Sequence, residues 1–258
     1  MQTLSRRSFL SGLCSCCAVL PLASCMAGKG AGGTSLSQQD EIKLGSESWQ
    51  RVLQTSRPAN NPPLKQMVTT ATTRIINAAG PAAKGLPWEV ELFENNEPNA
   101  FALPGGKVGV NTGLFNVAEN EHQLATVLGH EVRHVTGHHG AKRYEQAMQT
   151  QMGLQVVSIA LGASGVQDPK QVMSLLGAGA NVGIILPFSR DQESEADMVG
   201  LDYMHAAGYD VRQSVPFWQR MMQAGAGNTP TFLSSHPAGQ ERIAGLQQRI
   251  AQLNAGKA

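Results

Sequence analysis

The stretch Gly129-His130-Glu131-Val132-Arg133-His134 lies in an apolar helical pattern and places two histidines four residues apart. On an α-helix, this spacing turns the two side chains apart by about 40° and separates them by about one turn. Both imidazoles can therefore reach one tetrahedral zinc ion, and Glu131 faces the same opening as a general base. The stretch predicts a buried helix with two metal ligands and a proton acceptor, which need a third ligand from elsewhere.

The composition limits which side chains could complete such a site. The chain has 258 residues, of which 41% are hydrophobic, and this is enough for a sizeable core. Its formal net charge is +1 and it has no basic block, so nucleic acid is not an expected partner. A metal site in the body must use histidine and carboxylate ligands, because every cysteine falls within the first 25 residues. These cysteines are Cys14, Cys16, Cys17 and Cys25.

The amino terminus is similar to a bacterial export signal. Arg6 and Arg7 resemble the twin-arginine signal and precede an apolar run over residues 9–23, which is shorter than the roughly 20 residues that span a bilayer. The following Leu22-Ala23-Ser24-Cys25 resembles a lipobox, which predicts cleavage before Cys25 and acylation of that residue. Cleavage after Ala27 is the alternative, and it would give a soluble periplasmic protein.

This interpretation divides the chain into three parts. Residues 1–24 form the signal peptide, residues 25–37 a flexible tether rich in Gly and Ser, and residues 38–258 the folded domain. A lipid on Cys25 would hold the domain at the periplasmic face of a membrane. Met26, which is not an aspartate, is compatible with transport to the outer membrane.

The folded domain combines helical and extended patterns, which predicts an α+β fold. Apolar stripes of helical spacing cover residues 38–55 and 64–79. Asn120, with Gln123 three residues later, is a candidate N-cap for the helix that carries the two histidines. Short strands are expected at residues 88–93, 99–103 and 107–110, in a sheet of three or four strands. Two apolar stretches, residues 152–166 and 172–187, are expected to form a packed helical hairpin beside the site.

A third ligand is available in Ser189-Arg190-Asp191-Gln192-Glu193-Ser194-Glu195-Ala196-Asp197, which opens another helix. Spacing alone does not choose between its two glutamates. Glu193 and Asp197 share a helix face, whereas Glu195 points about 200° away from Glu193. A ligand histidine needs an acid near its other ring nitrogen, and Glu193 with Asp197 supplies both a ligand and that acid. Glu193 is therefore the predicted ligand and Asp197 the orienting acid.

Three motifs together resemble the minigluzincin zinc metallopeptidases. These motifs are the His130–His134 stretch, the segment with Glu193 and Asp197, and Ser235-His236-Pro237. The group includes the CAAX prenyl proteases, HtpX, BepA and LoiP, and the layout of this chain is closer to the LoiP-type periplasmic lipoprotein peptidases than to the repeat-bearing BepA. The resemblance covers about residues 36–253. It implies a mainly helical zincin-type domain whose edge strand, Asn99-Ala100-Phe101-Ala102, faces the zinc cleft and holds the substrate backbone.

The resemblance also implies an activity, a zinc metalloendopeptidase with one Zn²⁺ per chain. His130, His134 and Glu193 would hold the ion, and Glu131 would act as the general base. His236 would be an oxyanion donor or a plug over the metal, and its plain structural role would be to cap the final helix. Expected substrates are misfolded or stalled envelope proteins. The alternative function is a chaperone-like binding module with a plugged, mostly latent zinc site.

Overall fold

The computed structural model describes residues 36–147, 187–225, 230–237 and 239–255. The expected signal peptide and lipobox fall outside these residues, as do nearly all of the tether. The apolar stretches at 152–166 and 172–187 also fall outside them, apart from Pro187. Among the described helices, none is both long and apolar enough to cross a membrane.

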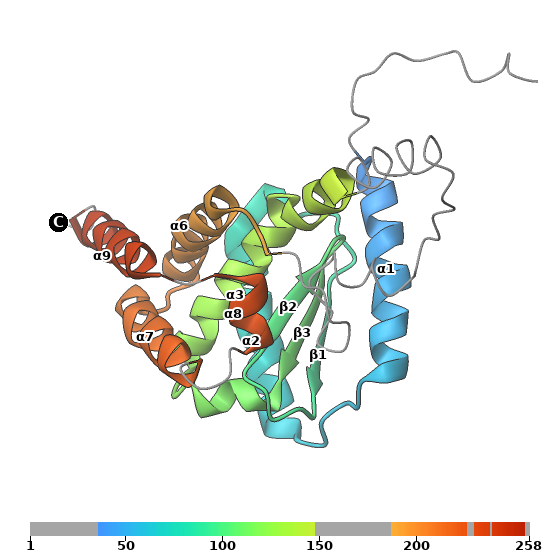
Figure 1. Cartoon of the computed structure of the whole chain (residues 1–258), viewed down its shortest axis with the longest axis horizontal. Coiled ribbons are helices and arrows are strands. Elements are labelled where there is room, and N and C mark those ends of the chain that lie inside the picture. Colours follow the sequence, from blue (N-terminus) through green and yellow to red (C-terminus); the bar gives the residue numbers. More distant parts are fainter. Residues whose placement is uncertain (1–35, 148–186, 226–229, 238, 256–258) are drawn as a thin grey trace, which may run out of the picture. The chain divides into compact units, whose positions relative to one another are not determined.

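The described part of the chain has the predicted α+β class and is mainly helical (Figure 1). The first predicted helix is confirmed, and the second begins two residues earlier than predicted. Asn61 caps it by accepting a hydrogen bond from Leu64 N, and Pro62 and Pro63 occupy its first turn, where a missing N–H costs little. The helices are α1 (Gln38–Thr55), α2 (Pro62–Ala79), α3 (Glu121–Thr136), α6 (Arg190–Ala206), α7 (Ser214–Ala224), α8 (Thr231–Ser235) and α9 (Gln240–Ala255).

The three predicted strands form a small mixed sheet in the order β1-β3-β2. The central strand β3 runs parallel to β1 and antiparallel to β2, so β2 lies at an edge. The turn between β2 and β3 requires left-handed backbone, and Gly105 and Gly106 supply it with φ angles of 73° and 89°. The strands are β1 (Glu89–Phe93), β2 (Ala100–Leu103) and β3 (Lys107–Asn111).

The sheet lies between α1 on one face and α2 and α3 on the other (Figure 1). It separates two apolar clusters. On one face, α1 covers the sheet through Trp49, whose ring lies 5.8 Å from that of Phe93. On the other face, α3 packs against α2, α6 and β2, and its residues Leu124 and Leu128 are fully buried. The helix that carries the histidine pair therefore runs through the main core of the domain.

Two glycines allow α3 and α6 to cross with their backbones in contact. A Cβ atom on Gly129 would lie 2.7 Å from the carbonyl oxygen of Gly200, and a Cβ on Gly200 would lie 2.9 Å from the carbonyl carbon of Gly129. A larger side chain at either position would push these helices apart, because a packed core cannot absorb the added volume. The crossing brings the Glu193 end of α6 alongside His130 on α3.

Candidate metal centre

The carboxyl-terminal half of α3 carries three of the predicted site residues. The helix begins as the capping pattern predicted, with the Asn120 side chain accepting a hydrogen bond from Gln123 N at 3.0 Å. Farther along, His130, Glu131 and His134 are 2%, 1% and 3% exposed. Such burial excludes bulk water and strengthens every electrostatic interaction in the site.

Two other elements bring side chains to the same place. A capping box between Ser189 and Gln192 begins α6 and fixes Glu193 in its first turn, with Asp197 one turn later. His236 directly follows α8, and its backbone N–H donates to Phe232 O. Glu193, Asp197 and His236 are all buried. Segments far apart in the sequence therefore converge on the end of α3.

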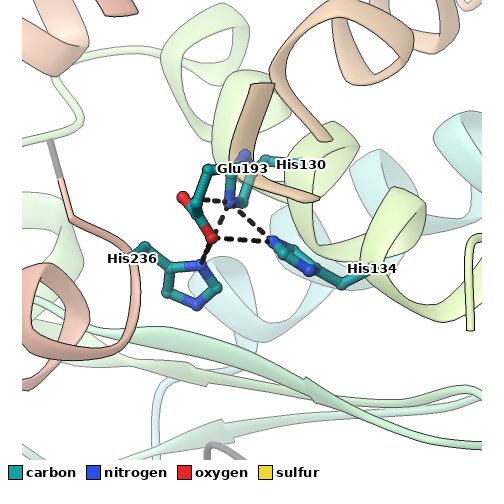
Figure 2. Close-up of side chains that lie close together, drawn as sticks. All are labelled: His130, His134, Glu193 and His236. Carbon is teal, nitrogen blue, oxygen red and sulfur yellow. Dashed lines mark hydrogen bonds and ion pairs between the residues drawn. The ribbon is translucent and has the colours of Figure 1, made fainter. Parts of the chain in front are cut away.

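His130, His134, Glu193 and His236 form one cluster, in which the possible ligand atoms all lie within 4.8 Å of one another (Figure 2). His130 Nε2 is 3.0 Å from His134 Nε2 and 3.2 Å from His236 Nδ1. Glu193 Oε1 is 3.3 Å from His134 Nε2 and 2.8 Å from His236 Nδ1. Atoms about 2.0–2.1 Å from one tetrahedral ion lie about 3.3 Å apart, so these spacings fit zinc coordination.

Two buried carboxylate oxygens, one in this cluster and one beside it, are left without a hydrogen bond from any described residue. They are Glu131 Oε1 and Glu193 Oε2. Their nearest cationic or ring nitrogens are His236 Nε2, 3.5 Å from the first, and Arg242 Nη2, 3.2 Å from the second. Buried polar atoms normally have partners, and a bound cation with its water would provide them here. Two imidazoles and a carboxylate are also a common donor set for catalytic zinc, so the residues fit the ion.

The charge states of the cluster also suit metal binding. Burial raises the pKa of Glu193, but the nearby His236 and His130 and hydrogen bonds to its carboxylate outweigh this effect, and the net pKa lies well below the ordinary value. Burial lowers the pKa of His134 well below its ordinary value. The cluster thus offers an ionised carboxylate and a neutral imidazole, the forms that bind metals.

The chain is similar to a known family of proteins. The model of peptidase family M48 matches residues 58–250. The chain belongs to peptidase family M48. This confirms the metallopeptidase resemblance of the three motifs and makes the clustered residues the candidate centre of an M48 domain.

Two M48 relatives show how far the likeness extends. The chain is 34% identical to the mitochondrial metalloendopeptidase OMA1 of Schizosaccharomyces pombe, over 74% of this chain and 54% of that protein. It is 30% identical to the beta-barrel assembly-enhancing protease of Escherichia coli (strain K12), over 86% of this chain and 46% of that protein. The chain therefore spans about half the length of these curated relatives.

Asp197 and Arg242 support His130 on the side of its ring that faces away from the other ligand atoms. Asp197 Oδ1 lies 2.9 Å from His130 Nδ1 and accepts its N–H. Arg242 forms an ion pair with the Asp197 carboxylate, with Nη2 at 2.7 Å and Nε at 2.6 Å. Its guanidinium carbon lies 3.4 Å from the centre of the Trp218 ring. From the sequence, Arg242 could equally be a surface ion pair or a support for the site acids. Its buried contacts identify it as a support.

From the sequence, His139 is expected to make polar contacts at the end of the helix and Glu195 to be a solvated or structural acid, yet the structure connects both to His134. His139 Nδ1 lies 3.0 Å from His134 Nδ1, and His139 Nε2 lies 3.0 Å from Glu195 Oε2. α3 ends at Thr136, His138 adopts a positive φ of 57°, and a new helical stretch begins at His139. Gly137 leaves room for the His139 ring, since a Cβ there would lie 2.6 Å from His139 Nε2. Gly137, two residues before His139, is the sequence feature that could have indicated this contact.

The predicted substrate strand borders the site, but in this structure it is covered. Asn99, Ala100, Phe101 and Ala102 are 5%, 1%, 8% and 8% exposed. The Phe101 side chain faces away from the site and packs with Trp49. The backbone N–H of Ala102 donates to the Glu131 carboxylate, so the edge of β2 is in direct contact with the predicted general base.

Proposed function

We propose that this M48 chain is a zinc-dependent endopeptidase that cleaves misfolded or stalled proteins of a bacterial envelope. One observation carries the proposal: His130, His134 and Glu193 converge at spacings that suit one ion, with Glu131 beside them. Three protein ligands leave one position for a reacting water, as in catalytic rather than structural zinc sites.

Glu131 is well placed to move the proton in this reaction. Zinc bound by His130, His134 and Glu193 would lower the pKa of a water molecule to about 7. Burial raises the pKa of Glu131 against the opposing charges of His236 and His130, so its carboxylate is a stronger proton acceptor than an ordinary glutamate. Glu131 takes the proton of the water that attacks the peptide carbonyl, and then gives that proton to the leaving amine.

The edge of β2 suits an extended substrate. The Asn99 carbonyl accepts a hydrogen bond from Asn111 N–H of β3. Because backbone groups alternate along an antiparallel strand, Ala100 and Ala102 direct theirs away from β3. An unfolded segment could add to this edge as a further strand and bring its peptide bond near Glu131. The name of the E. coli relative, a beta-barrel assembly-enhancing protease, supports envelope proteins as the substrate class.

Metal-dependent digestion of an unfolded protein tests the proposal. We expect purified protein to cleave casein, a chelator to abolish cleavage, and added Zn²⁺ to restore it, because the ligand atoms of His130, His134 and Glu193 lie at spacings that suit one ion. Fragment release is followed by electrophoresis and mass spectrometry. Cleavage that continues unchanged after the metal has been removed and its absence verified would refute the zinc mechanism.

We also propose that Cys25 carries a lipid that holds the domain at the periplasmic face of a membrane, with the outer membrane favoured by Met26. Its support is the lipobox-like Leu22-Ala23-Ser24-Cys25. We expect Cys25→Ser to move the protein from the membrane fraction to the soluble periplasmic fraction, because a lipid anchor supplies most of its membrane affinity. Fractionation and immunoblotting measure this shift. An unchanged membrane fraction would contradict the anchor.

A second function is favoured by one observation. His236 Nδ1 lies among the ligand atoms, 2.8 Å from Glu193 Oε1, where it could close the site. A closed site would suit a protein that binds unfolded chains without cleaving them. Zinc-loaded wild type that cleaves several unfolded substrates no faster than Glu131→Gln would establish this alternative.

A further inference from the structure

We propose that His139 is a positioning residue, which fixes the orientation and tautomer of His134, and that Glu195 fixes His139 in turn. The inference rests on the proposed zinc function. It deepens that function by assigning the support of the second ligand histidine to a pair of residues outside the HExxH motif. The contact that carries it is the 3.0 Å separation of His139 Nδ1 and His134 Nδ1.

Two imidazole nitrogens at this distance form a hydrogen bond only if one carries a hydrogen and the other does not. Glu195 determines which nitrogen carries the hydrogen, because an ionised carboxylate can only accept a hydrogen bond. Its Oε2 lies 3.0 Å from His139 Nε2, so in the neutral ring this nitrogen carries the single hydrogen and His139 Nδ1 is left as an acceptor. His134 must then donate from Nδ1. Its Nε2 is thereby left with a free lone pair directed into the cluster.

The opposite tautomer of His139, with its hydrogen on Nδ1, is unfavourable both at Glu195 and at His134. It would turn a lone pair of His139 towards the acceptor-only Glu195 carboxylate. It would also place a hydrogen on His134 Nε2, which lies 3.0 Å from His130 Nε2, and this would block metal binding there. The carboxylate therefore selects the metal-binding tautomer of His134 through the intervening ring.

The positioning pair is itself held in place. The His139 side chain is fully buried, and Arg133 Nη2 also hydrogen-bonds the Glu195 carboxylate. Residues 139–147 are helical, so His139 lies at the start of a regular element and not in a loose turn. Each ligand histidine on α3 thus has a support that depends on α6, Asp197 for His130 and Glu195, through His139, for His134.

Three substitutions at this position separate its two contacts. Asn places its side-chain amide near the former Nδ1 and can still accept from His134. Gln reaches the former Nε2 position and can still bond Glu195, but it leaves His134 without its acceptor. Leu removes both contacts while keeping an apolar side chain of similar bulk.

Zinc affinity is the measurement, made on the purified chain by competition with a chromogenic chelator. We expect His139→Leu and His139→Gln to weaken the affinity by about 10–100-fold, the usual effect of losing an outer support of a metal ligand. The affinity of His139→Asn should lie nearer to wild type than to His139→Gln. The absorption spectrum of the Co²⁺-loaded protein should change in the same order, because it reports directly on the ligand geometry.

His138→Asn is the matched control. This neighbouring histidine is half exposed and contacts Glu41, and Asn tolerates its positive φ. We expect its zinc affinity to equal that of wild type. Thermal unfolding of each metal-free variant tests folding, and if His139→Leu does not fold, the Asn and Gln variants decide.

Two results would overturn the inference in distinguishable ways. If wild type binds zinc and His139→Gln binds it equally well, the positioning role is wrong and the zinc function stands. If wild type binds no zinc, the proposed function fails, and the role of His139 fails with it.

Discussion

Glu131→Gln should lower the rate of casein cleavage by about 10²–10⁴-fold, because an amide cannot accept the proton of the attacking water. The replacement keeps the size of the side chain, and its amide oxygen can still accept the hydrogen bond from Ala102 N–H. Zinc affinity should remain within a small factor of wild type, because Glu131 is not among the clustered ligand residues. Cleavage rate and bound zinc per molecule are measured on the same preparations.

Glu119→Gln is a matched control for this prediction. Glu119 precedes the N-cap of α3, and its side chain is 63% exposed in an ion pair with Arg220. The same chemical change there should leave cleavage unaffected, since exposed ion pairs contribute little. Residual cleavage by Glu131→Gln near the wild-type rate would show that another group accepts the proton. A loss of zinc together with activity would instead make Glu131 part of the metal site.

Much of the fold could be predicted because its signals are local. The bounds of α1 follow from its apolar periodicity, and α3 begins where Asn120 and Gln123 predict it. The strands were found through their short apolar runs and the turn at Gly105 and Gly106. Prolines such as Pro62 and Pro63 are typical of a break between helices, but here they begin α2, because the first turn of a helix needs no N–H from them.

The site residues that could be predicted are likewise those whose signals are local. The spacing of His130 and His134 and the shared face of Glu193 and Asp197 are properties of single helices, and the structure brings all four residues together. The role of Glu195 depends on the break between α3 and the helical stretch that begins at His139, and on a contact between separate helices. Sequence spacing places Glu195 on the opposite side of α6 from Glu193. A carboxylate there can still support the site, because the His139 side chain lies between Glu195 and His134.

The contact between Ala102 and Glu131 links the substrate strand to the general base. Because Ala102 N–H already donates to the Glu131 carboxylate, we expect a substrate strand on this edge to lie next to the proton acceptor. The strand is buried in this structure, however, so an extended chain must displace what covers it. We therefore expect access to the strand to limit cleavage, and His236, which lies among the ligand atoms, is the candidate residue for this effect.

His236→Ala should raise kcat/KM for casein by about tenfold. The ring is 2% exposed and its Nδ1 lies 3.2 Å from His130 Nε2, in a position from which it could act as a fourth ligand. Four protein ligands close a zinc site, whereas catalysis requires an open position. If the closed form makes up about nine tenths of the molecules, removing the plug increases the competent fraction about tenfold.

The other roles of His236 predict different results from the same measurement. If His236 donates to the oxyanion, His236→Ala should lower kcat by about 10²–10³-fold. If His236 only caps a helix, the substitution should change stability but not turnover. The ring stacks with Phe188 and Phe232 at 5.0 and 4.7 Å, so the variant is also tested for bound zinc and thermal unfolding. His205→Ala, about 18 Å along α6 from Glu193, is the control for loss of a histidine. A gain in cleavage that Glu131→Gln abolishes when combined with His236→Ala would place the plug over the same site, and a loss would assign His236 to oxyanion stabilisation.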